Sequence, residues 1–290
     1  MGWYGYLGLW CAGFGGVALV GYVRYLAGAT EAQRTVRTVG RIEHVTPPRH
    51  GDSRTDGIRV VVSFQDPSTG AEFTVTNDGE AGERGERVKA AWVGRPIGVR
   101  YLSGQPHAHR FTHDVSERPH GGLGLPNCAL FLVYAGVVTV AAIERGWPWA
   151  LLGFAGPWAL SLVHHLPENV RDTRRRRDTL AAMTAVPGRV VAVLKSVGTD
   201  EDGNTLTTIV PVVAFTTHDG TAVTAACEWG IPDPARSYGR ELTIHHAPDD
   251  PADFTADIAG AHRAWRQGIV FDTLGFVVVA ATAVVGAVAL

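Results

Sequence analysis

The chain has 290 residues, of which 46% are hydrophobic and 19% are charged, and its mean hydropathy is +0.05. This composition excludes a disordered chain, which would be more polar, and a fibrous protein, which would be repetitive. Of the 54 charged residues (26 basic plus 28 acidic), 25 lie in residues 30–122 and 25 in residues 164–267. A water-soluble globular protein carries charge on every surface element, so the long uncharged stretches exclude that class and indicate a membrane protein.

The first predicted element, residues 1–29, is a transmembrane helix. Residues 3–23 carry no charge, and 21 helical residues at about 1.5 Å each span about 31 Å, the thickness of a bilayer's hydrocarbon core. Arg24 follows directly and is expected at the membrane interface. A cleaved signal peptide is the alternative, because residues 27–29 are small, but a basic start is missing and the apolar stretch is too long.

Residues 30–122 are polar and make the first predicted β module. Runs rich in Val, Ile, Thr and Phe, such as residues 59–64, alternate with turn signals such as residues 66–70, which predicts a hairpin. The other expected elements are a first strand near residues 39–45, a mobile hairpin loop at 47–57, a short helix or exposed loop at 80–89, and a last strand near 97–101.

Residues 123–166 are predicted to form a transmembrane hairpin. Two uncharged stretches, 123–143 and 146–166, are separated by a turn of only residues 144–146. Trp147 and Trp149 follow this turn and are expected in the aromatic belt of the interface.

Residues 167–267 make a second predicted β module, which begins with a basic run, Arg174, Arg175, Arg176 and Arg177. This run follows a transmembrane stretch directly, so we expect it at the lipid headgroups. The expected β elements are a first strand near residues 187–195, a mobile loop at 198–203, a strand within 207–216 and a last strand near 241–246.

The two polar segments match each other in four blocks that occur in the same order. Gly40-Arg41 matches Gly188-Arg189, residues 60–64 match 211–215, Gly70 matches Gly220, and residues 93–99 match 238–244. Four ordered matches predict a tandem duplication of one unit, a helix followed by a β module and a second helix. The predicted fold class is therefore membrane α plus β, with four transmembrane helices and two homologous small antiparallel modules, each a barrel or a sandwich.

The last element, residues 268–290, is the fourth predicted transmembrane helix, with an uncharged stretch at 273–290. Asp272 is expected at its end, on the same membrane face as Arg24. We favour independent solvation of both side chains at the headgroups over a specific ion pair. Four crossings and one short turn place both β modules on the same side of the membrane and both termini on the other.

Arginines near the membrane ends predict which side is cytoplasmic. The side of the β modules holds thirteen of them: Arg24, Arg34, Arg37, Arg41, Arg110, Arg118, Arg171, Arg174, Arg175, Arg176, Arg177, Arg263 and Arg266. The opposite side holds only Arg145. The β modules are therefore predicted to be cytoplasmic in the cell membrane.

The layout resembles a bacterial membrane-associated family catalogued as domain of unknown function 3592, present here as two copies. The resemblance rests on the early Gly-Arg strand, the strand ending in Phe, the Gly turn and the closing strands at 93–101 and 238–246. These motifs are structural, so the resemblance implies a fold and a membrane setting and transfers no catalytic residue.

No phosphate-binding loop, nucleophile elbow or metal-binding Cys pair is present, which argues against an enzyme and predicts no cofactor and no catalytic residue. His107, His109 and His113 form the densest histidine cluster and are weak metal candidates. Because a closed site needs a fourth ligand, we interpret them as a solvated loop and predict no metal.

The expected partners are the lipid bilayer and a further membrane or cytoplasmic protein. Nucleic acid is not expected, because residues 164–267 hold 11 basic and 14 acidic residues, a net charge of −3. The preferred interpretation is a non-enzymatic, membrane-tethered binding or assembly module whose β modules dock a partner or each other. The alternative is a small transporter or sensor subunit.

Overall fold

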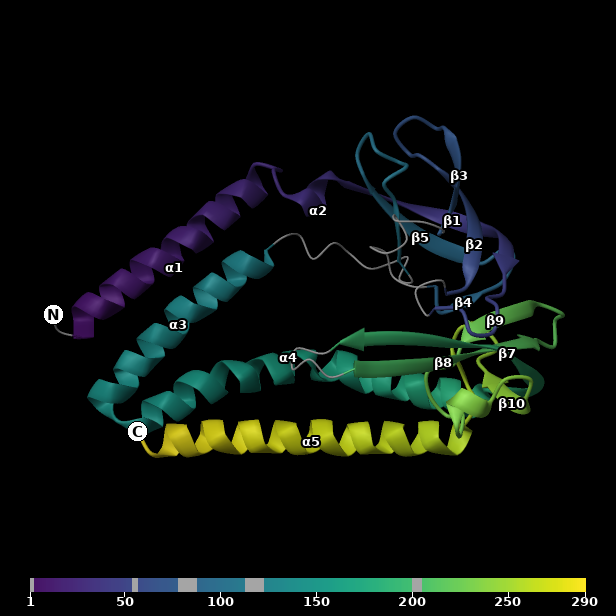
Figure 1. Cartoon of the computed structure of the whole chain (residues 1–290). Coiled ribbons are helices and arrows are strands. Elements are labelled where there is room, and N and C mark those ends of the chain that lie inside the picture. Colours follow the sequence, from purple (N-terminus) through teal and green to yellow (C-terminus); the bar gives the residue numbers. More distant parts are fainter. Residues whose placement is uncertain (1–2, 54–56, 78–87, 113–122, 200–204) are drawn as a thin grey trace. The chain divides into compact units, whose positions relative to one another are not determined.

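The structure is a computed structural model that describes residues 3–53, 57–77, 88–112, 123–199 and 205–290 (Figure 1). The chain forms two compact units. The helical unit consists of Met1–Arg34, Arg118–Arg177 and Ala264–Leu290, and the β unit consists of Thr35–Glu117 and Asp178–Arg263. Both predicted β modules therefore belong to one compact unit.

The helices are α1 (Trp3–Leu26), the short α2 (Glu31–Arg34), α3 (Gly124–Arg145), α4 (Trp147–Ala182) and α5 (Ile258–Val288). Within the described ranges, three of them are long and apolar enough to cross a membrane, namely α1, α3 and α5. The third predicted crossing lies in α4, which falls short of that standard. Its first twelve residues include the tryptophans and prolines Trp147, Pro148, Trp149, Pro157 and Trp158, which lower the hydropathy of an otherwise apolar stretch.

Within the helical unit, α1 packs against α3. The Trp10 indole N–H donates to the Leu132 carbonyl at 2.8 Å, and the Tyr22 hydroxyl donates to the Asn127 side chain at 2.6 Å. Gly136 allows this approach, because a Cβ there would lie 2.8 Å from the Trp10 ring. Polar groups between these helices thus bind each other, as a hydrocarbon environment requires.

Two predicted boundaries and one predicted position are wrong. Helix α4 continues past residue 166 to Ala182, because the charged segment there contains good helix formers. Helix α5 begins at Ile258, where the Asp257 carboxylate accepts a hydrogen bond from the Gly260 N–H at 2.8 Å and caps the helix. Asp272 therefore lies 14 residues after the first residue of α5 (272 minus 258) and not at a helix end.

The β unit contains two antiparallel sheets. The first sheet has the order β3 (Glu72–Thr76), β2 (Arg59–Gln65), β1 (Thr35–Thr46), β5 (Pro96–Leu102), β6 (Arg110–Thr112). The second has the order β11 (Phe254–Thr255), β10 (Glu241–His246), β7 (Thr184–Thr199), β8 (Thr205–Thr216), β9 (Ala222–Ala226), β4 (Ala90–Ala91). A 3-10 turn at Pro234–Arg236 precedes β10. The predicted strands are found, whereas most of the predicted element at residues 80–89 lies outside the described residues.

The two sheets share strand order and local irregularities. Five strands of each follow the same sequence of neighbours, β3-β2-β1-β5-β6 and β9-β8-β7-β10-β11. The register shifts once in each long strand, between Ile42 and His44 in β1 and between Val190 and Ala192 in β7. These are β-bulges at matching positions, since both follow the Gly-Arg pair.

A glycine sits at the matching position of both long strands for steric reasons. A Cβ on Gly40 would lie 2.5 Å from the Val62 side chain, and a Cβ on Gly188 would lie 2.6 Å from Ile244. Each glycine therefore lets a core side chain from a neighbouring strand fill the space next to the backbone.

The first module contributes a strand to the second sheet. Strand β4 pairs with β9, with Ala90 opposite Ala225, and the Ala226 N–H donates to the Lys89 carbonyl at 2.7 Å (Figure 1). The sheet of the second module is thus completed by a segment that precedes its partner strand β9 by 131 residues (222 minus 91).

A second contact between the modules corrects the predicted mobile loop at residues 47–57. The Gly51 N–H donates to the Val193 carbonyl at 3.1 Å, and the Lys195 N–H donates to the Asp52 carbonyl at 3.2 Å. The His50 ring stacks on Tyr238 with centroids 4.0 Å apart. The described part of this loop is therefore docked on β7.

The hydrophobic cores also cross the boundary between the modules. The core under the first sheet contains Ala192, Leu194 and Val212 from the second module, and the core of the second sheet contains Ala90 from the first. Residues 190–194 of β7 are buried or half-buried on both faces of the strand, which explains why this run is unbroken and apolar. The β unit is one folded body rather than two tethered ones.

A buried carboxylate closes the β2–β3 turn. The Asp66 side chain, 6% exposed, accepts hydrogen bonds from the Ser68 N–H at 2.9 Å, the Thr69 hydroxyl at 2.9 Å and the Tyr101 hydroxyl at 2.9 Å. The donors, above all the Ser68 backbone N–H, lower the pKa of Asp66 to about 2, and burial together with Asp66 raises the pKa of Tyr101 to about 12.

Candidate functional site

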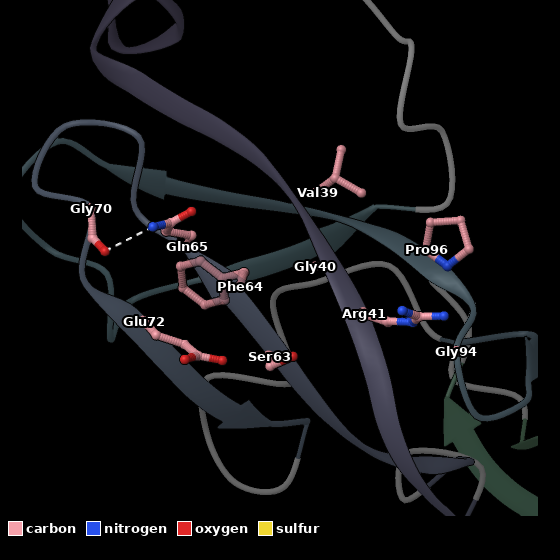
Figure 2. Close-up of a pocket in the computed structure, with 10 residues that line it drawn as sticks. All are labelled: Val39, Gly40, Arg41, Ser63, Phe64, Gln65, Gly70, Glu72, Gly94 and Pro96. Atoms are coloured by element: carbon pink, nitrogen blue, oxygen red, sulfur yellow. Dashed lines mark hydrogen bonds between the residues drawn. The ribbon is translucent and has the colours of Figure 1, made fainter.

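An open hollow of about 700 Å³ lies on the first sheet, on residues of β1, β2, β3 and β5 and the adjoining turns (Figure 2). Alternation along β1 places Gly40 and Ile42 toward the core and Val39 and Arg41 toward the outside. The residues that line the hollow are Val39, Gly40, Arg41, Ser63, Phe64, Gln65, Gly70, Glu72, Gly94 and Pro96.

The hollow carries opposite charges at its two ends. Figure 2 shows Arg41 beside Gly94 and Pro96 at one end, and Glu72 beside Gln65 and Gly70 at the other. Both charged side chains are exposed, and within the described ranges neither makes an ion pair. Val39, two residues before Arg41 on β1, lies at the Arg41 end in Figure 2 and is 52% exposed. A cation, an apolar contact and an anion are thus presented to solvent on one rigid sheet.

The matching positions of the second sheet have different chemistry. The register places Arg41 opposite Ser63 and Gln65 opposite Glu72, and it places Arg189 opposite Ala214 and Thr216 opposite Ala222. The acid of the hollow is therefore alanine in the second sheet. There the Arg189 Nε–H is engaged, because it donates to the Gly239 carbonyl at 3.3 Å. The charge pattern of the hollow belongs to the first module alone.

The structure describes two of the three histidine candidates, His107 and His109. His109 is 8% exposed, and its two ring nitrogens lie 3.2 Å from the His107 carbonyl and 3.3 Å from the Thr76 carbonyl. The His107 ring packs edge-on against Phe73, and His113 lies outside the described residues. In the part of the chain that the structure describes, no group of three or more His, Cys, Asp or Glu side chains could hold a metal ion.

The predicted membrane-interface residues lie on the helices. Those on α4 are exposed or half-buried: Trp147, Trp149, Arg174, Arg175, Arg176 and Arg177. The Arg145 guanidinium lies 5.1 Å from the Trp149 ring centroid at the α3–α4 turn. Arg24 and Asp272 are both exposed, and the described residues contain no ion pair between them.

No protein-family model, no curated protein and no solved structure matches the chain. Arg41 is visible in the sequence as part of a repeated Gly-Arg pair, whereas no local pattern predicts that Val39 and Glu72 line the same hollow. The available signal was Val39 itself, which is an apolar residue at an outward position of a strand in which inward and outward residues alternate.

Proposed function

We propose that this protein is a membrane-anchored binding protein whose four helices hold the β unit at one face of the bilayer, where the hollow of the first sheet docks a segment of a partner protein. The hollow is the observation that carries the binding function, because it combines Arg41, Val39 and Glu72 on one exposed face. The partner segment has an acidic residue for Arg41, a basic residue for Glu72 and an apolar residue for Val39.

The apolar surfaces of α1, α3 and α5 suit a lipid environment. Only 6% of the most apolar part of α1, 17% of that of α3 and 0% of that of α5 is buried against protein. In water, surfaces of this size would make the chain aggregate. This supports a membrane location.

The shared sheet supports four crossings rather than three. Because β4 and β9 pair in one sheet, the two modules lie on the same side of any membrane. The chain between them contains α3 and α4, so if α3 crosses, α4 must cross back. Helix α4 does so in this proposal despite its tryptophans and prolines, which neighbouring helices and the interface accommodate.

Sidedness can be tested by cysteine labelling in a chain whose Cys11, Cys128 and Cys227 are replaced with alanine. New cysteines replace the exposed Arg49 of the first module, the exposed Arg236 of the second, and Trp147 in the α3–α4 turn. With an impermeant maleimide, we expect labelling at 147 in intact cells and at 49 and 236 only after permeabilisation. Labelling of 49 in intact cells would invert the topology, and labelling of 49 and 236 from opposite sides would contradict the shared sheet.

We also propose that the β unit arose by tandem duplication within the family catalogued as domain of unknown function 3592. The common strand order and the bulges that follow Gly40-Arg41 and Gly188-Arg189 support this origin. In this proposal the second copy keeps the fold and the arginine at position 189 but has alanine at position 222, in place of the acid of the hollow.

The binding function is tested by photo-crosslinking in cells. A photoreactive residue replaces Val39 in the hollow, and in the matched control it replaces Pro187, the corresponding residue of the second sheet. We expect a crosslinked partner from position 39, reduced at least tenfold when Arg41→Glu and Glu72→Arg are combined with it, and none from position 187. Equal crosslinking from both positions, or crosslinking unaffected by the charge reversal, would exclude the hollow as the docking site.

The helices favour an anchor over a transporter. A transporter needs polar or ionisable groups along a path between its helices. Here the described polar contacts between helices, such as Trp10 with Leu132 and Tyr22 with Asn127, are direct hydrogen bonds that hold neighbouring helices together. We therefore place the function in the β unit.

A further inference from the structure

The two sheets differ at one pair of matching edges. Strand β3 is the edge strand of the first sheet, and among the described residues no strand pairs with its outer side (Figure 1). The corresponding strand of the second sheet is β9, which is covered by β4. Thr74 of β3 lies opposite Ser63, and Thr224 of β9 lies opposite Ala214, the residue that matches Ser63. The fold thus accepts an added strand at this edge, because Thr224 pairs with Ala91.

The backbone of β3 directs hydrogen-bonding groups toward its outer edge. At the β2–β3 turn, the Asp66 N–H donates to the Ala71 carbonyl at 2.9 Å. Hydrogen-bonded pairs alternate with non-bonded pairs along an antiparallel ladder. The residue after Ala71 is therefore in a non-bonded pair, and so is every second residue from there. The N–H and C=O groups of Glu72, Thr74 and Thr76 consequently point away from β2.

This edge is regular and accessible. The side chains of Glu72, Thr74 and Thr76 are exposed, and the pairing of β3 with β2 has no register shift. Native edge strands are commonly protected by prolines, lysines or bulges, and residues 72–76 contain none of these. In the described ranges the outward groups have one printed neighbour, the His109 Nε2, which lies 3.3 Å from the Thr76 carbonyl. The edge is therefore open to a further strand around Thr74.

We propose that β3 pairs antiparallel with β3 of a second copy of this chain, about a two-fold axis at Thr74. In this register Thr74 lies opposite itself and Glu72 lies opposite Thr76, so no like charges meet and two threonines are paired. Phe73 lies opposite Val75, and both belong to the core side of the sheet. The apolar side of one sheet thus continues into the other, while the outward N–H and C=O groups bind each other.

Two other registers would also bring outward groups together, and both are less favourable. An axis at Glu72 would place two carboxylates directly opposite each other, which is destabilising. An axis at Thr76 would put the His109 ring, which lies at the Thr76 carbonyl, at the centre of the pairing. The axis at Thr74 pairs all five residues of β3.

The proposed dimer does not depend on the docking function of the hollow. The edge pairs through backbone groups, whereas the hollow is lined by side chains on the outer face of the sheet. Glu72 belongs to both, with its backbone at the edge and its side chain at the hollow.

The test is cysteine crosslinking of the full chain in cell membranes, with the native cysteines replaced by alanine. Opposed residues have Cβ atoms about 4.5–5.5 Å apart, so a bifunctional thiol reagent of that length should join Thr74→Cys to itself. It should also join Glu72→Cys to a co-expressed, differently tagged Thr76→Cys chain. The matched control is Glu72→Cys alone, because its two copies would be four residues apart along the strands, about 13 Å. We expect at least tenfold less crosslinking in the control.

Two substitutions at the centre of the edge should abolish the pairing. Thr74→Pro removes an outward N–H that the ladder with β2 does not use, so the sheet should still form. Thr74→Lys places two ammonium groups opposite each other on an exposed position. Each should reduce crosslinking between Glu72→Cys and Thr76→Cys at least tenfold, whereas Thr74→Val should leave it unchanged. Thermal midpoints of the variants close to that of the parent chain would show that they remain folded.

The outcomes separate this pairing from random collision and from other dimers. Crosslinking of Glu72→Cys alone that equals its crosslinking to Thr76→Cys would contradict the register. Crosslinking that survives both Thr74→Pro and Thr74→Lys would assign the contact to another surface. The absence of any crosslink from positions 72, 74 and 76 would mean that this edge does not meet a second copy. Each of these results would overturn the proposal.

Discussion

Replacing Leu194 with alanine is expected to destabilise both β modules together, by about 2–5 kcal/mol. Leu194 is 2% exposed and belongs to β7 of the second module, yet it packs into the core under the first sheet. The cavity left by the truncation opens where the two modules meet. Hydrogen–deuterium exchange should therefore accelerate in β2 and β5 of the first module as well as in β7.

The matched control for this substitution is Val93→Ala, since Val93 is 64% exposed. Its effect should stay within about 0.5 kcal/mol, and exchange in both sheets should be unchanged. Faster exchange confined to the second module after Leu194→Ala would mean that the two cores unfold independently, and the description of the β unit as one folded body would have to be abandoned.

Replacing Tyr101 with phenylalanine is expected to lower the thermal midpoint by a few degrees at neutral pH. The substitution removes the hydroxyl that donates to Asp66 at 2.9 Å inside the β unit, and it leaves part of a buried carboxylate without its donor. Losing a hydrogen bond to an ionised group costs more than losing one between neutral groups. The control is Tyr238→Phe. Tyr238 is 56% exposed, and its ring, which the substitution keeps, stacks on His50.

The same pair gives a pH dependence with a definite sign. The pKa of Asp66 is about 2 in the folded protein, below the value of about 3.9 for an unfolded chain. Its contribution to stability is therefore complete above about pH 5 and is lost as the pH falls toward 2. The difference in midpoint between wild type and Tyr101→Phe should shrink over this range, and a difference that grows on acidification would contradict the assignment.

Local sequence patterns predicted the elements well, because those elements depend on nearest neighbours. The apolar helices follow from hydropathy and length, and strands such as β2 and β10 follow from Val-, Ile- and Thr-rich runs bounded by turn residues. The predicted ends of the helices were less accurate. The start of α5, for example, depends on a single cap at Asp257, which a hydropathy pattern does not reveal.

The contacts between the modules could not be predicted, because they join residues that are distant in sequence. Strand β4 is only Ala90–Ala91, which is too short to show any period. One signal was available: residues 190–194 of β7 are all apolar, whereas the matching strand β1 has Glu43 in its bulge and His44 directly after it. A strand without polar positions indicates burial on both faces, and hence a partner for its second face.

Because strand β4 of the first module pairs within the sheet of the second module, the proposed topology links completion of the β unit to membrane insertion. The ribosome synthesises β4, which ends at Ala91, long before β9, which starts at Ala222, and it synthesises α3 and α4 in between. In the proposed topology, β4 therefore stays without its partner strand β9 until α3 and α4 have both crossed the bilayer and returned the chain to its starting side. Failure of either insertion would leave the second sheet with an open edge, a form that quality-control proteases and chaperones can distinguish from the finished protein.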